Sequence, residues 1–560
     1  MSDKDQKMSV HEAVHNSWRR YGIAETLPPC DLHTLVDVLR TAVAHHPEAP
    51  AVTSLGRTLT YAELDRLSTA FACYMQQHTK LEVGDRIAIQ MPSLIQYLVV
   101  AYGAFKAGLV VVNVNPMYTA VELEYQFNHA DVKAVVAFDK FLDHAMEVRD
   151  KTPLQTIIST GPFDLHPTAK RVVMSLLMTL TGKCYSTGDA ISLREVLAKG
   201  ADHRCQSVDL KQSDPALLQY TGGTTGVSKP AMLSHGNMVS VTRQATVLLK
   251  LIGMQPGRER FVSPLPLYHI YAFALVITTG VHMAAHSMLV PDPRNIKGFV
   301  KLLRRWPATL FSGLNTLFVA LMKDPGFSRI DFSTLKLTLS GGSALASGTG
   351  REWLEKTGCE ISEAYGLTEA SPIVSFTPPH ANKPGAVGIA VPETDLMIAD
   401  DDGQPLGVNE HGELWVRGPQ VMAGYLHFPE ETANTLTEDG WLKTGDIASV
   451  DEDGFLRIHD RKKDLVIVSG FNVYPNEIES VVSHHPDVAY CAAVGVPDEH
   501  SGEAVKLYVV SNNPALTAKD IHDFCAGQLA RYKLPKYIEF RDELPLSNVG
   551  KVLRKELRDE

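Results

Sequence analysis

Cysteine is scarce in this sequence and never closely paired. Seven cysteines are spread over 560 residues, at positions 30, 73, 184, 205, 359, 491 and 525. The count is odd and no Cys-x-x-Cys occurs, which argues against a disulfide framework and against a structural zinc site. Such cysteine usage is typical of a reducing compartment, so we expect a cytoplasmic protein.

An excess of basic residues is also missing. The formal net charge is −11, whereas a general nucleic-acid binder needs a basic surface, so we expect no nucleic-acid partner. Residues 1–20 are polar and charged and contain no apolar core of a signal peptide. A few well-placed cations are enough to bind a small anionic ligand, and that ligand class stays open.

Long uncharged stretches are rare, and the longest lies around residues 271–290. Its length would permit a membrane span. His282, His286 and the lack of cationic flanks favour a buried core segment instead. A shorter apolar segment, 171–183, is basic at both ends and is interpreted either as a partly buried helix or as a helix resting on a membrane surface. Peripheral contact with the inner face of a membrane therefore stays an alternative.

The first half of the chain alternates strand and helix patterns. Residues 86–91 and 109–115 are expected strands, and residues 93–107 between them form an expected apolar helix. This alternation predicts an α/β fold with a largely parallel sheet.

The pattern changes after about residue 455. A dense charge cluster at 460–464 is followed by a small α+β arrangement of two helices and three strands, with the second helix expected at 517–531. We therefore expect a large, multi-layered N-terminal domain at residues 1–460 and a small, mobile C-terminal domain at residues 461–560.

One segment is rich in glycine and threonine: residues 220–229, YTGGTTGVSK. Glycines permit close backbone approach, and backbone N–H groups, hydroxyls and one lysine together suit a polyphosphate. The spacing is not that of a Walker A loop. A plain turn could share this composition, but ten specified positions favour phosphate binding. The candidate residues are Thr221, Gly222, Gly223, Thr224, Thr225, Gly226 and Lys229.

This segment resembles the signature loop of the adenylate-forming (AMP-binding) superfamily, which includes acyl-CoA synthetases, luciferases and peptide-synthetase adenylation domains. From about residue 30 to the C-terminus the sequence most resembles bacterial long-chain fatty-acid:CoA ligases, with long matched runs at 469–479 and 540–560. The resemblance implies ATP, Mg²⁺, coenzyme A and a fatty acid as ligands. Two positions depart from the family pattern: Pro230 replaces a glycine, and Gly236 replaces an arginine.

Residues 363–369, EAYGLTE, resemble the second adenylate motif of the family. Tyr365 can stack on adenine, with Gly366 beside it. Thr368 can hydrogen-bond a phosphate oxygen, and Glu369 is an oxygen ligand suited to Mg²⁺. Taken without the resemblance, the string could also be a helix start with an acidic first turn.

Further parts of the nucleotide site rest on the resemblance alone. The residues are Gly342, Ser343 and Ala344 on the adenine side, Asp446 at the ribose hydroxyls, Arg461 at ribose and phosphate, and Gly470 beside the path of the CoA thiol. A turn aspartate and a solvated charge cluster are the alternatives for Asp446 and Arg461.

Four residues are implied in catalysis: Thr368, Glu369, His269 and Lys551. Lys551 matches the catalytic lysine of the adenylation step in the family, although a lysine followed by more basic residues is ordinarily a surface tail. His269 would flank the reacting carboxylate, and a satisfied core histidine is the alternative.

Residues 261–290 contain no Asp or Glu, and this absence narrows the range of possible acyl substrates. An amino-acid-activating relative would need a carboxylate here for the substrate ammonium, so we expect a fatty acid of long or medium chain. An aryl-acid-activating enzyme, a luciferase-like oxygenase and a ligase-derived binding protein of reduced activity are the alternatives, the last because of Pro230 and Gly236. A homodimer is common in similar enzymes and stays open here.

Overall fold

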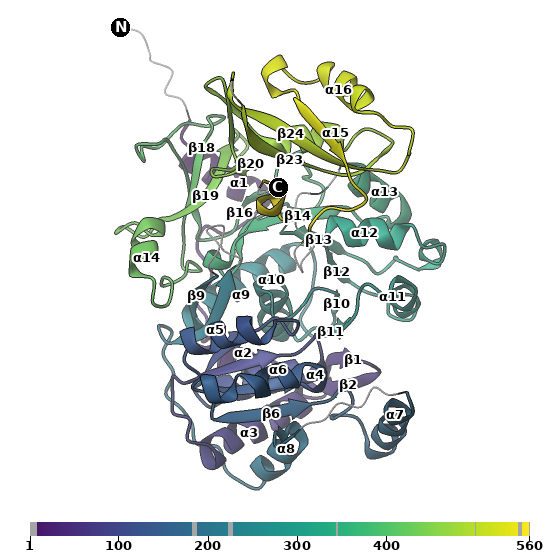
Figure 1. Cartoon of the computed structure of the whole chain (residues 1–560). Helices are drawn as coiled ribbons and strands as arrows, with labels where there is room; N and C mark the ends of the chain where they lie inside the picture. Colours follow the sequence, from purple (N-terminus) through teal and green to yellow (C-terminus); the bar gives the residue numbers. More distant parts are fainter. Residues whose placement is uncertain are drawn as a thin grey trace.

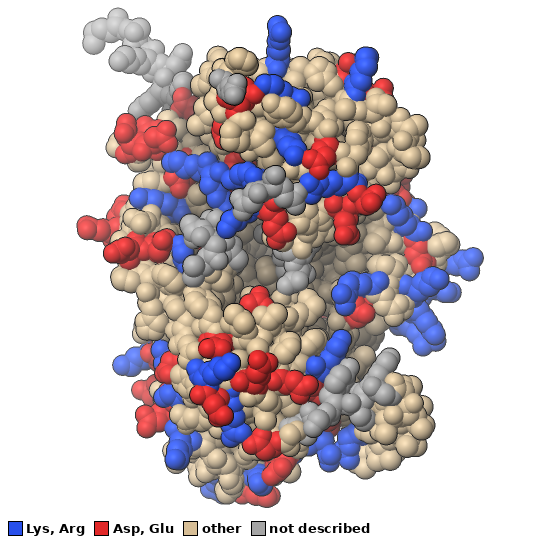
Figure 2. All heavy atoms as spheres, viewed as in Figure 1, with Lys and Arg blue, Asp and Glu red and all other residues tan. Residues whose placement is uncertain are grey.

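Two large sheets with helices between them form the N-terminal part of the chain (Figure 1). The computed structural model describes residues 8–181, 188–221, 228–342, 345, 347–498, 500–546 and 552–558. A small C-terminal part lies against one end of the large part, and the face in Figure 2 is hollowed between the two.

The first large sheet has seven strands. Their order is β7 (Ile191–Ser192), β6 (Thr156–Thr160), β5 (Val132–Phe138), β3 (Arg86–Gln90), β4 (Val110–Asn113), β8 (Pro215–Thr221) and β9 (Lys229–Ser234). All neighbours are parallel except β8 and β9. The central strands are buried on both faces, which explains their continuous apolar runs. The expected α/β class with a largely parallel sheet is confirmed.

The second large sheet has nine strands. Their order is β16 (Ile389–Ala390), β15 (Ile373–Phe376), β14 (Ile361–Gly366), β13 (Leu337–Gly341), β12 (Leu310–Gly313), β10 (Arg260–Ser263), β11 (His286–Leu289), β1 (Pro50–Ser54) and β2 (Arg57–Thr60). The run from β14 to β1 is parallel. Parallel strands bring their carboxyl ends to one edge of the sheet, which is where ligands bind in α/β proteins.

Helices between the large sheets fill the main core. They include α2 (Leu35–His45), α3 (Tyr61–His78), α4 (Ile95–Lys106) and α9 (His235–Leu251). The expected helix at 93–107 is α4, which is buried over most of its surface. Helices α3 and α5 (Ala120–His129) each begin with a capping box, from Thr60 with Glu63 and from Thr119 with Glu122.

Residues 271–290 form a buried core segment, as expected. They comprise the end of α10 (Ile270–Ala272), the π-helix η3 (Phe273–Gly280), whose residues are all buried, and β11. Within the described part of the chain, no helix has both the length and the apolar character needed to cross a membrane.

Two smaller sheets complete the chain. The first is antiparallel and contains β17 (Asp395–Ala399), β18 (Gly412–Arg417), β19 (Leu442–Val450) and β20 (Leu456–Arg461). The second contains β22 (Phe471–Val473), β21 (Val466–Val468), β24 (Gly502–Ser511), β23 (Val488–Asp498) and β25 (Tyr537–Phe540). Helices α15 (Pro475–Val482), α16 (Ala518–Ala526) and α17 (Arg554–Arg558) accompany this second sheet, which has its own apolar core.

The α+β pattern expected for the C-terminal part is confirmed, with one boundary error. A helix was expected over residues 517–531, but α16 ends at Ala526. Gly527 follows it, and Arg531–Lys533 forms a separate 3₁₀ turn. Glycine favours a helix end because it loses more backbone entropy in a helix than other residues do.

Helix α7 (Thr168–Leu180) covers the apolar segment at 171–183 as far as that segment is described. It lies at the side of the molecule (Figure 1). None of its residues is buried, and only Arg171, Met174 and Met178 are half-buried. Of the two interpretations from sequence, the structure is closer to a surface helix than to a helix packed in the core.

Candidate nucleotide site

The glycine- and threonine-rich segment connects two antiparallel strands at the edge of the seven-stranded sheet. Thr221 ends β8 and pairs with Lys229, which begins β9. The Thr221 hydroxyl donates to the Lys229 carbonyl at 3.3 Å, and the Ser228 hydroxyl donates to the Thr221 carbonyl at 2.5 Å. The structure therefore describes both ends of the candidate phosphate segment. The predicted residues Gly222, Gly223, Thr224, Thr225 and Gly226 lie outside the described residues.

Lys229 is held by helix α14 (Pro429–Thr435). Its ammonium lies 2.5 Å from Oε2 of Glu431, and the Lys229 side chain is only 13% exposed. The ammonium also lies 5.8 Å from the centre of the Tyr425 ring, within the range of a cation–π interaction. A phosphate that takes this lysine must therefore compete with the Glu431 carboxylate.

Glu369 belongs to the short helix η5 (Thr368–Ala370), which also contains Thr368. The Tyr425 hydroxyl donates to Oε1 of Glu369 at 2.7 Å. Tyr425 thus contacts Lys229 with its ring and Glu369 with its hydroxyl. This arrangement places the predicted phosphate-binding lysine and the predicted metal ligand on either side of one tyrosine.

Tyr365, Asp446 and Arg461 meet in a second group of contacts. The Tyr365 hydroxyl donates to Asp446, whose carboxylate is 2% exposed and lies 2.6 Å from Nε of Arg461. Asp446 on β19 is also the register partner of Arg461 on β20. Burial alone would lower the pKa of the Arg461 guanidinium, but Asp446, Tyr365 and Glu369 outweigh it and raise that pKa. Three predicted residues from three separate motifs are therefore in direct contact, and Glu369 acts on Arg461 through its charge.

Backbone geometry explains why two positions of the site are glycines. A Cβ at Gly366 would lie 1.6 Å from the Pro372 carbonyl oxygen, so no other residue fits there. Gly342 follows β13 with φ +83°, a conformation that favours glycine. Its predicted neighbours Ser343 and Ala344 lie outside the described residues.

The other predicted residues are His269, Gly470 and Lys551. His269 is half-buried and caps α10, accepting from the Tyr271 backbone N–H at 3.4 Å. Gly470 forms the turn between β21 and β22 on the C-terminal sheet, with no atom within 4 Å of where a Cβ would stand. Lys551 lies outside the described residues.

The two departures from the family pattern each fit their surroundings. Pro230 lies on β9, the last strand of its sheet, where proline is tolerated, and its carbonyl accepts from the Leu426 N–H at 3.0 Å. Gly236 donates its N–H to the Gln212 carbonyl at 2.7 Å, and a Cβ there would lie 3.0 Å from the same oxygen. A larger residue at 236 would have to push this segment away.

Sequence reasoning missed Tyr425 and Glu431. Both lie in the connection between β18 and β19, in a stretch without metal-ligand or catalytic spacing. The ion pair joins residues 202 positions apart, so only the tertiary structure brings them together.

We expect Glu431→Gln to strengthen ATP binding. The ion pair with Glu431 occupies Lys229, and a pair with one exposed partner is worth up to about 1 kcal/mol, or roughly a 5-fold effect. Isothermal titration should therefore give a dissociation constant for ATP about 2–5 times lower in the variant. The matched control is Glu430→Gln, an exposed neighbour on α14, which should leave the constant unchanged. An unchanged or weaker affinity in Glu431→Gln would contradict competition.

Glu363, on β14, is expected to make stability depend on pH. Burial raises the pKa of its carboxyl to about 7. In the unfolded chain the group ionises near its ordinary value of 4.5, so between about pH 4.5 and 7 the folded state holds the extra proton. The free energy of unfolding contributed by this group is therefore fully present below this window and falls as the pH rises through it.

The test is denaturant unfolding of Glu363→Gln across pH 5 to pH 8 beside the unchanged chain. Because the amide cannot ionise, the variant should gain on the order of 1–2 kcal/mol relative to the unchanged chain at the upper end of this range. Parallel pH profiles for the two proteins would contradict the raised pKa.

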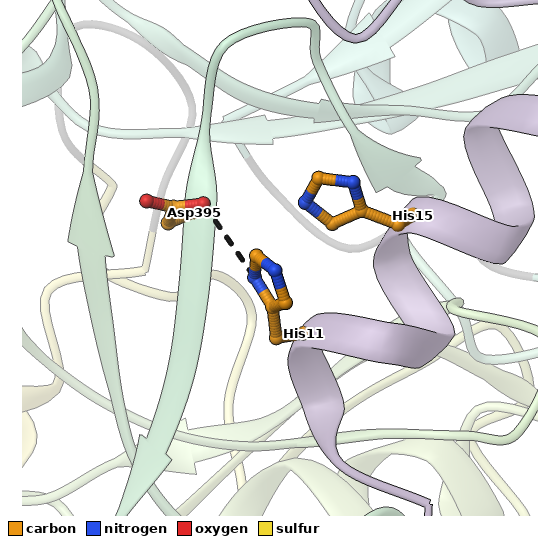
Figure 3. Close-up of side chains that lie close together, drawn as sticks. All are labelled: His11, His15 and Asp395. Atoms are coloured by element: carbon orange, nitrogen blue, oxygen red, sulfur yellow. Dashed lines mark ion pairs between the residues drawn. The ribbon is translucent and has the colours of Figure 1, made fainter.

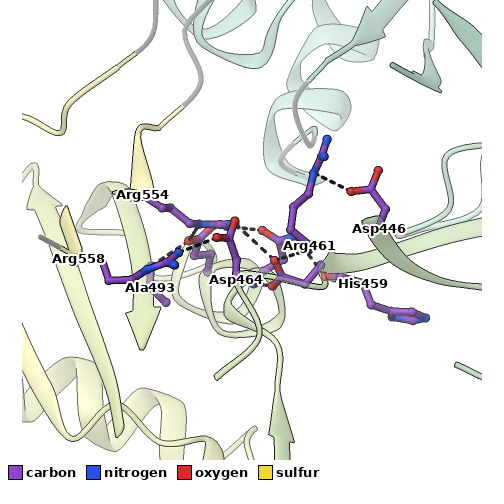
Figure 4. A network of polar contacts seen from close by, with 10 residues as sticks. Asp446, His459, Arg461, Asp464, Ala493, Arg554 and Arg558 are labelled. Carbon is purple, nitrogen blue, oxygen red and sulfur yellow. Dashed lines mark hydrogen bonds and ion pairs between the residues drawn. The ribbon is translucent and has the colours of Figure 1, made fainter. Parts of the chain in front are cut away.

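A second polar network joins the end of the chain to the connector between the two small sheets (Figure 4). Arg554 on α17 bonds Glu479 at 2.8 Å and lies 3.4 Å from Asp460 and 3.7 Å from Asp464. Burial raises the pKa of the Asp460 carboxyl to about 6, although Arg554 opposes this shift. The segment that follows Lys551 is thereby tied to the connector through a largely buried arginine.

A cluster of possible metal ligands occurs on α1 (Val10–Tyr21) and β17 (Figure 3). His11, His15 and Asp395 place one ligand atom each within 4.8 Å of one another. Asp395 is already bonded to Arg417 at 2.9 Å, and His15 lies 3.3 Å from Glu25. These partners compete with a cation for the same atoms, so we interpret the cluster as a surface ion-pair network.

Comparison with known proteins agrees with the arrangement of the site. The profile of the AMP-binding enzyme family matches residues 39–426, and that of the AMP-binding enzyme C-terminal domain matches residues 477–551. A long-chain-fatty-acid–CoA ligase of Yersinia pestis is 45% identical over 538 residues, which cover 95% of each chain. One from Haemophilus influenzae is 42% identical over 544 residues, covering 96% of this chain and 97% of that protein.

Solved structures give the same result. The crystal structure of ATP-bound MatB from Rhodopseudomonas palustris superimposes with a TM-score of 0.82 at 30% identity, covering 94% of this chain and 98% of the other. Sequence motifs, fold and relatives therefore agree over nearly the whole length, and the chain belongs to the AMP-binding enzyme family of adenylate-forming proteins.

Proposed function

We propose that the chain is an acyl-CoA synthetase of the AMP-forming type. It converts a fatty acid, ATP and coenzyme A into acyl-CoA, AMP and pyrophosphate through an acyl-adenylate. Relatives that share 42–45% of its residues over nearly their whole length are long-chain-fatty-acid–CoA ligases, which supports a long- or medium-chain substrate.

The observation that most supports the proposal is the meeting of Tyr365, Asp446 and Arg461. They come from three motifs that the sequence assigns to one nucleotide, and the charge of Glu369 helps to raise the pKa of Arg461. A structural ion pair alone would not need Tyr365 on Asp446 and Tyr425 on Glu369 as well. We therefore assign adenine to the Tyr365 side, ribose to Asp446 and Arg461, and the phosphates to Glu369, Lys229 and the segment after Thr221.

Mg²⁺ fits the donor set at Glu369. Its carboxylate is a hard oxygen ligand of the kind that Mg²⁺ prefers, and Thr368 adds a hydroxyl beside it. When bound there, the ion would neutralise charge on the phosphate oxygens.

In the first step, an oxygen of the fatty carboxylate attacks the α-phosphorus of ATP, and the bond to pyrophosphate breaks. Both reactants are anions, so the protein has to align them and offset their charge. In our assignment Lys229 leaves Glu431 for the outer phosphates, Arg461 holds the ribose side, and Lys551 reaches the reacting groups from the C-terminal domain. His269 borders the acyl carboxylate.

In the second step, the CoA sulfur attacks the acyl carbon and the carbon–oxygen bond to AMP breaks. We propose that the small domain, residues 461–560, moves between the two steps about the connector near residue 461. Lys551 then withdraws, and the turn with Gly470 lines the path of the thiol.

The test is a CoA-dependent AMP-release assay with a series of saturated fatty acids, an aryl acid and an amino acid. The proposal expects turnover with long or medium fatty acids and little with the other acids. Pyrophosphate exchange that occurs only with the aryl acid would support the aryl-acid-activating alternative. Absence of exchange with every acid would support a ligase-derived binding protein.

Two further expectations belong to this proposal. A long-chain substrate resides largely in lipid, so we propose that the protein contacts the inner face of the membrane peripherally. A homodimer stays a prediction, which analytical ultracentrifugation of the full chain can test.

A further inference from the structure

Helix α7 presents its most apolar face to solvent. The exposed residues are Val172 at 58%, Val173 at 57%, Leu176 at 60%, Leu177 at 48% and Leu180 at 73%. At about 100° per residue these five side chains fall within an arc of about 140°. Met174 and Met178, on the opposite side of the helix, are half-buried. This is the reverse of an ordinary surface helix, whose apolar stripe faces the core.

The charged residues of helix α7 itself have one sign. The helix carries Lys170 and Arg171 at its start and no Asp or Glu along its length. Lys170 donates to the Leu55 carbonyl at 3.1 Å, and Leu55, in the turn between β1 and β2, is itself 41% exposed. The outward face of α7 is drawn in tan at the lower right of Figure 2. An apolar face beside cations, without acids, is complementary to an anionic lipid surface.

The size of the face favours lipid over a second copy of the chain. The helix is about 20 Å long. Its five exposed side chains present roughly 500 Å², whereas a stable protein interface needs about 800 Å² on each partner. A patch of this size is large for a free surface of a monomer. A bilayer needs no matching surface, because a helix lying flat can sink its apolar side to the depth of the headgroups.

We propose that α7 is the element by which the protein docks on an anionic membrane. The Val172, Leu176 and Leu180 side enters the headgroup region, and Lys170 contacts lipid phosphates at its edge. This surface is separate from the nucleotide site, so docking needs neither ATP nor coenzyme A.

The experiment is co-sedimentation of the full chain with vesicles, without ATP, coenzyme A or fatty acid. One set of vesicles is phosphatidylcholine, and the other contains about 30% phosphatidylglycerol. Leu176→Asp with Leu177→Asp should lower binding to both sets by at least about 10-fold, because two leucines no longer enter the lipid. Lys170→Gln should lower binding only to the anionic set, by about 5-fold.

The matched control is Val83→Asp with Leu251→Asp, which adds the same charge at exposed apolar positions elsewhere. It should bind vesicles like the unchanged chain. Because α7 has no buried residue, its variants should fold and should activate a short, water-soluble fatty acid at the unchanged rate. Hydrogen exchange adds a second measurement: amides of residues 168–180 should gain protection only when anionic vesicles are present.

Three results would overturn the proposal. The first is equal vesicle binding by the unchanged chain and the leucine variant. The second is an equal loss in the control variant, which would assign the effect to net charge. The third is a dimer that becomes a monomer in the leucine variant, which would make α7 an interface between copies. None of these results depends on acyl-CoA synthesis, so they leave the proposed function separately testable.

Discussion

Lys551→Ala should lose acyl-adenylate formation by on the order of 10²–10³-fold, which is the usual effect of removing one group that stabilises charge in the transition state. The variant should still convert supplied acyl-adenylate and coenzyme A into acyl-CoA at close to the unchanged rate. The reason is that the fatty carboxylate and ATP are both anions in the first step, whereas the thiol attacks a neutral acyl carbon in the second. Single-turnover assays of each half-reaction measure the two effects separately.

The control for Lys551 is Lys555→Ala. Lys555 is a nearby basic residue, exposed on α17. If the end of the chain acted only as a basic surface tail, the two variants would behave alike. Equal loss of both half-reactions in Lys551→Ala would instead point to a disturbed C-terminal domain and would contradict a specific role in adenylation.

Much of the fold follows from local pattern in the sequence. Strands buried on both faces are continuous apolar runs, so β3 and β4 lie within the predicted ranges 86–91 and 109–115. Capping boxes mark the starts of α3 and α5 for the same local reason. The end of α16 was missed, since a helical pattern continues past the point where Gly527 lets the chain leave the helix.

The candidate site was predictable only in part. Tyr365, Glu369, Asp446 and Arg461 lie in motifs whose residue types already suit a nucleotide. The structure joins Tyr365, Asp446 and Arg461 by direct contacts, and the charge of Glu369 acts on Arg461. Glu431 carries no such signal, because an acidic residue in the first turn of a helix is ordinary capping chemistry. Its pairing with Lys229 depends on how α14 lies over the edge of another sheet.

Exposure is a second property that sequence patterns do not supply. The segment at 171–183 shows an apolar face, but periodicity cannot tell whether protein, lipid or water covers that face. Arg554 shows the opposite case. It belongs to a basic sequence typical of a surface tail, yet its side chain is only 16% exposed and meets three carboxylates. Such differences come from long-range packing.

Arg554→Met should therefore destabilise the C-terminal domain far more than the substitution of an exposed tail residue would. Removing the guanidinium takes away the cation that Asp460, Asp464 and Glu479 share. Asp460 is 0% exposed. Breaking a buried ion pair from one side costs about 3–5 kcal/mol, because the remaining charge is left uncompensated. The C-terminal domain should unfold at lower denaturant concentration, as followed by unfolding curves and limited proteolysis of the full chain.

Arg558→Met is the matched control for this prediction. Arg558 lies on the same helix and pairs with Asp464 at 2.6 Å, but its side chain is 37% exposed, so its loss should cost at most about 1 kcal/mol. Because Arg554 anchors the segment that follows Lys551, its variant should also form acyl-adenylate more slowly, even where the domain is still folded. The contradicting result is an Arg554 variant that is as stable as the Arg558 variant. It would mean that the three carboxylates are neutralised without Arg554. The proposal that this network anchors Lys551 would then have to be abandoned.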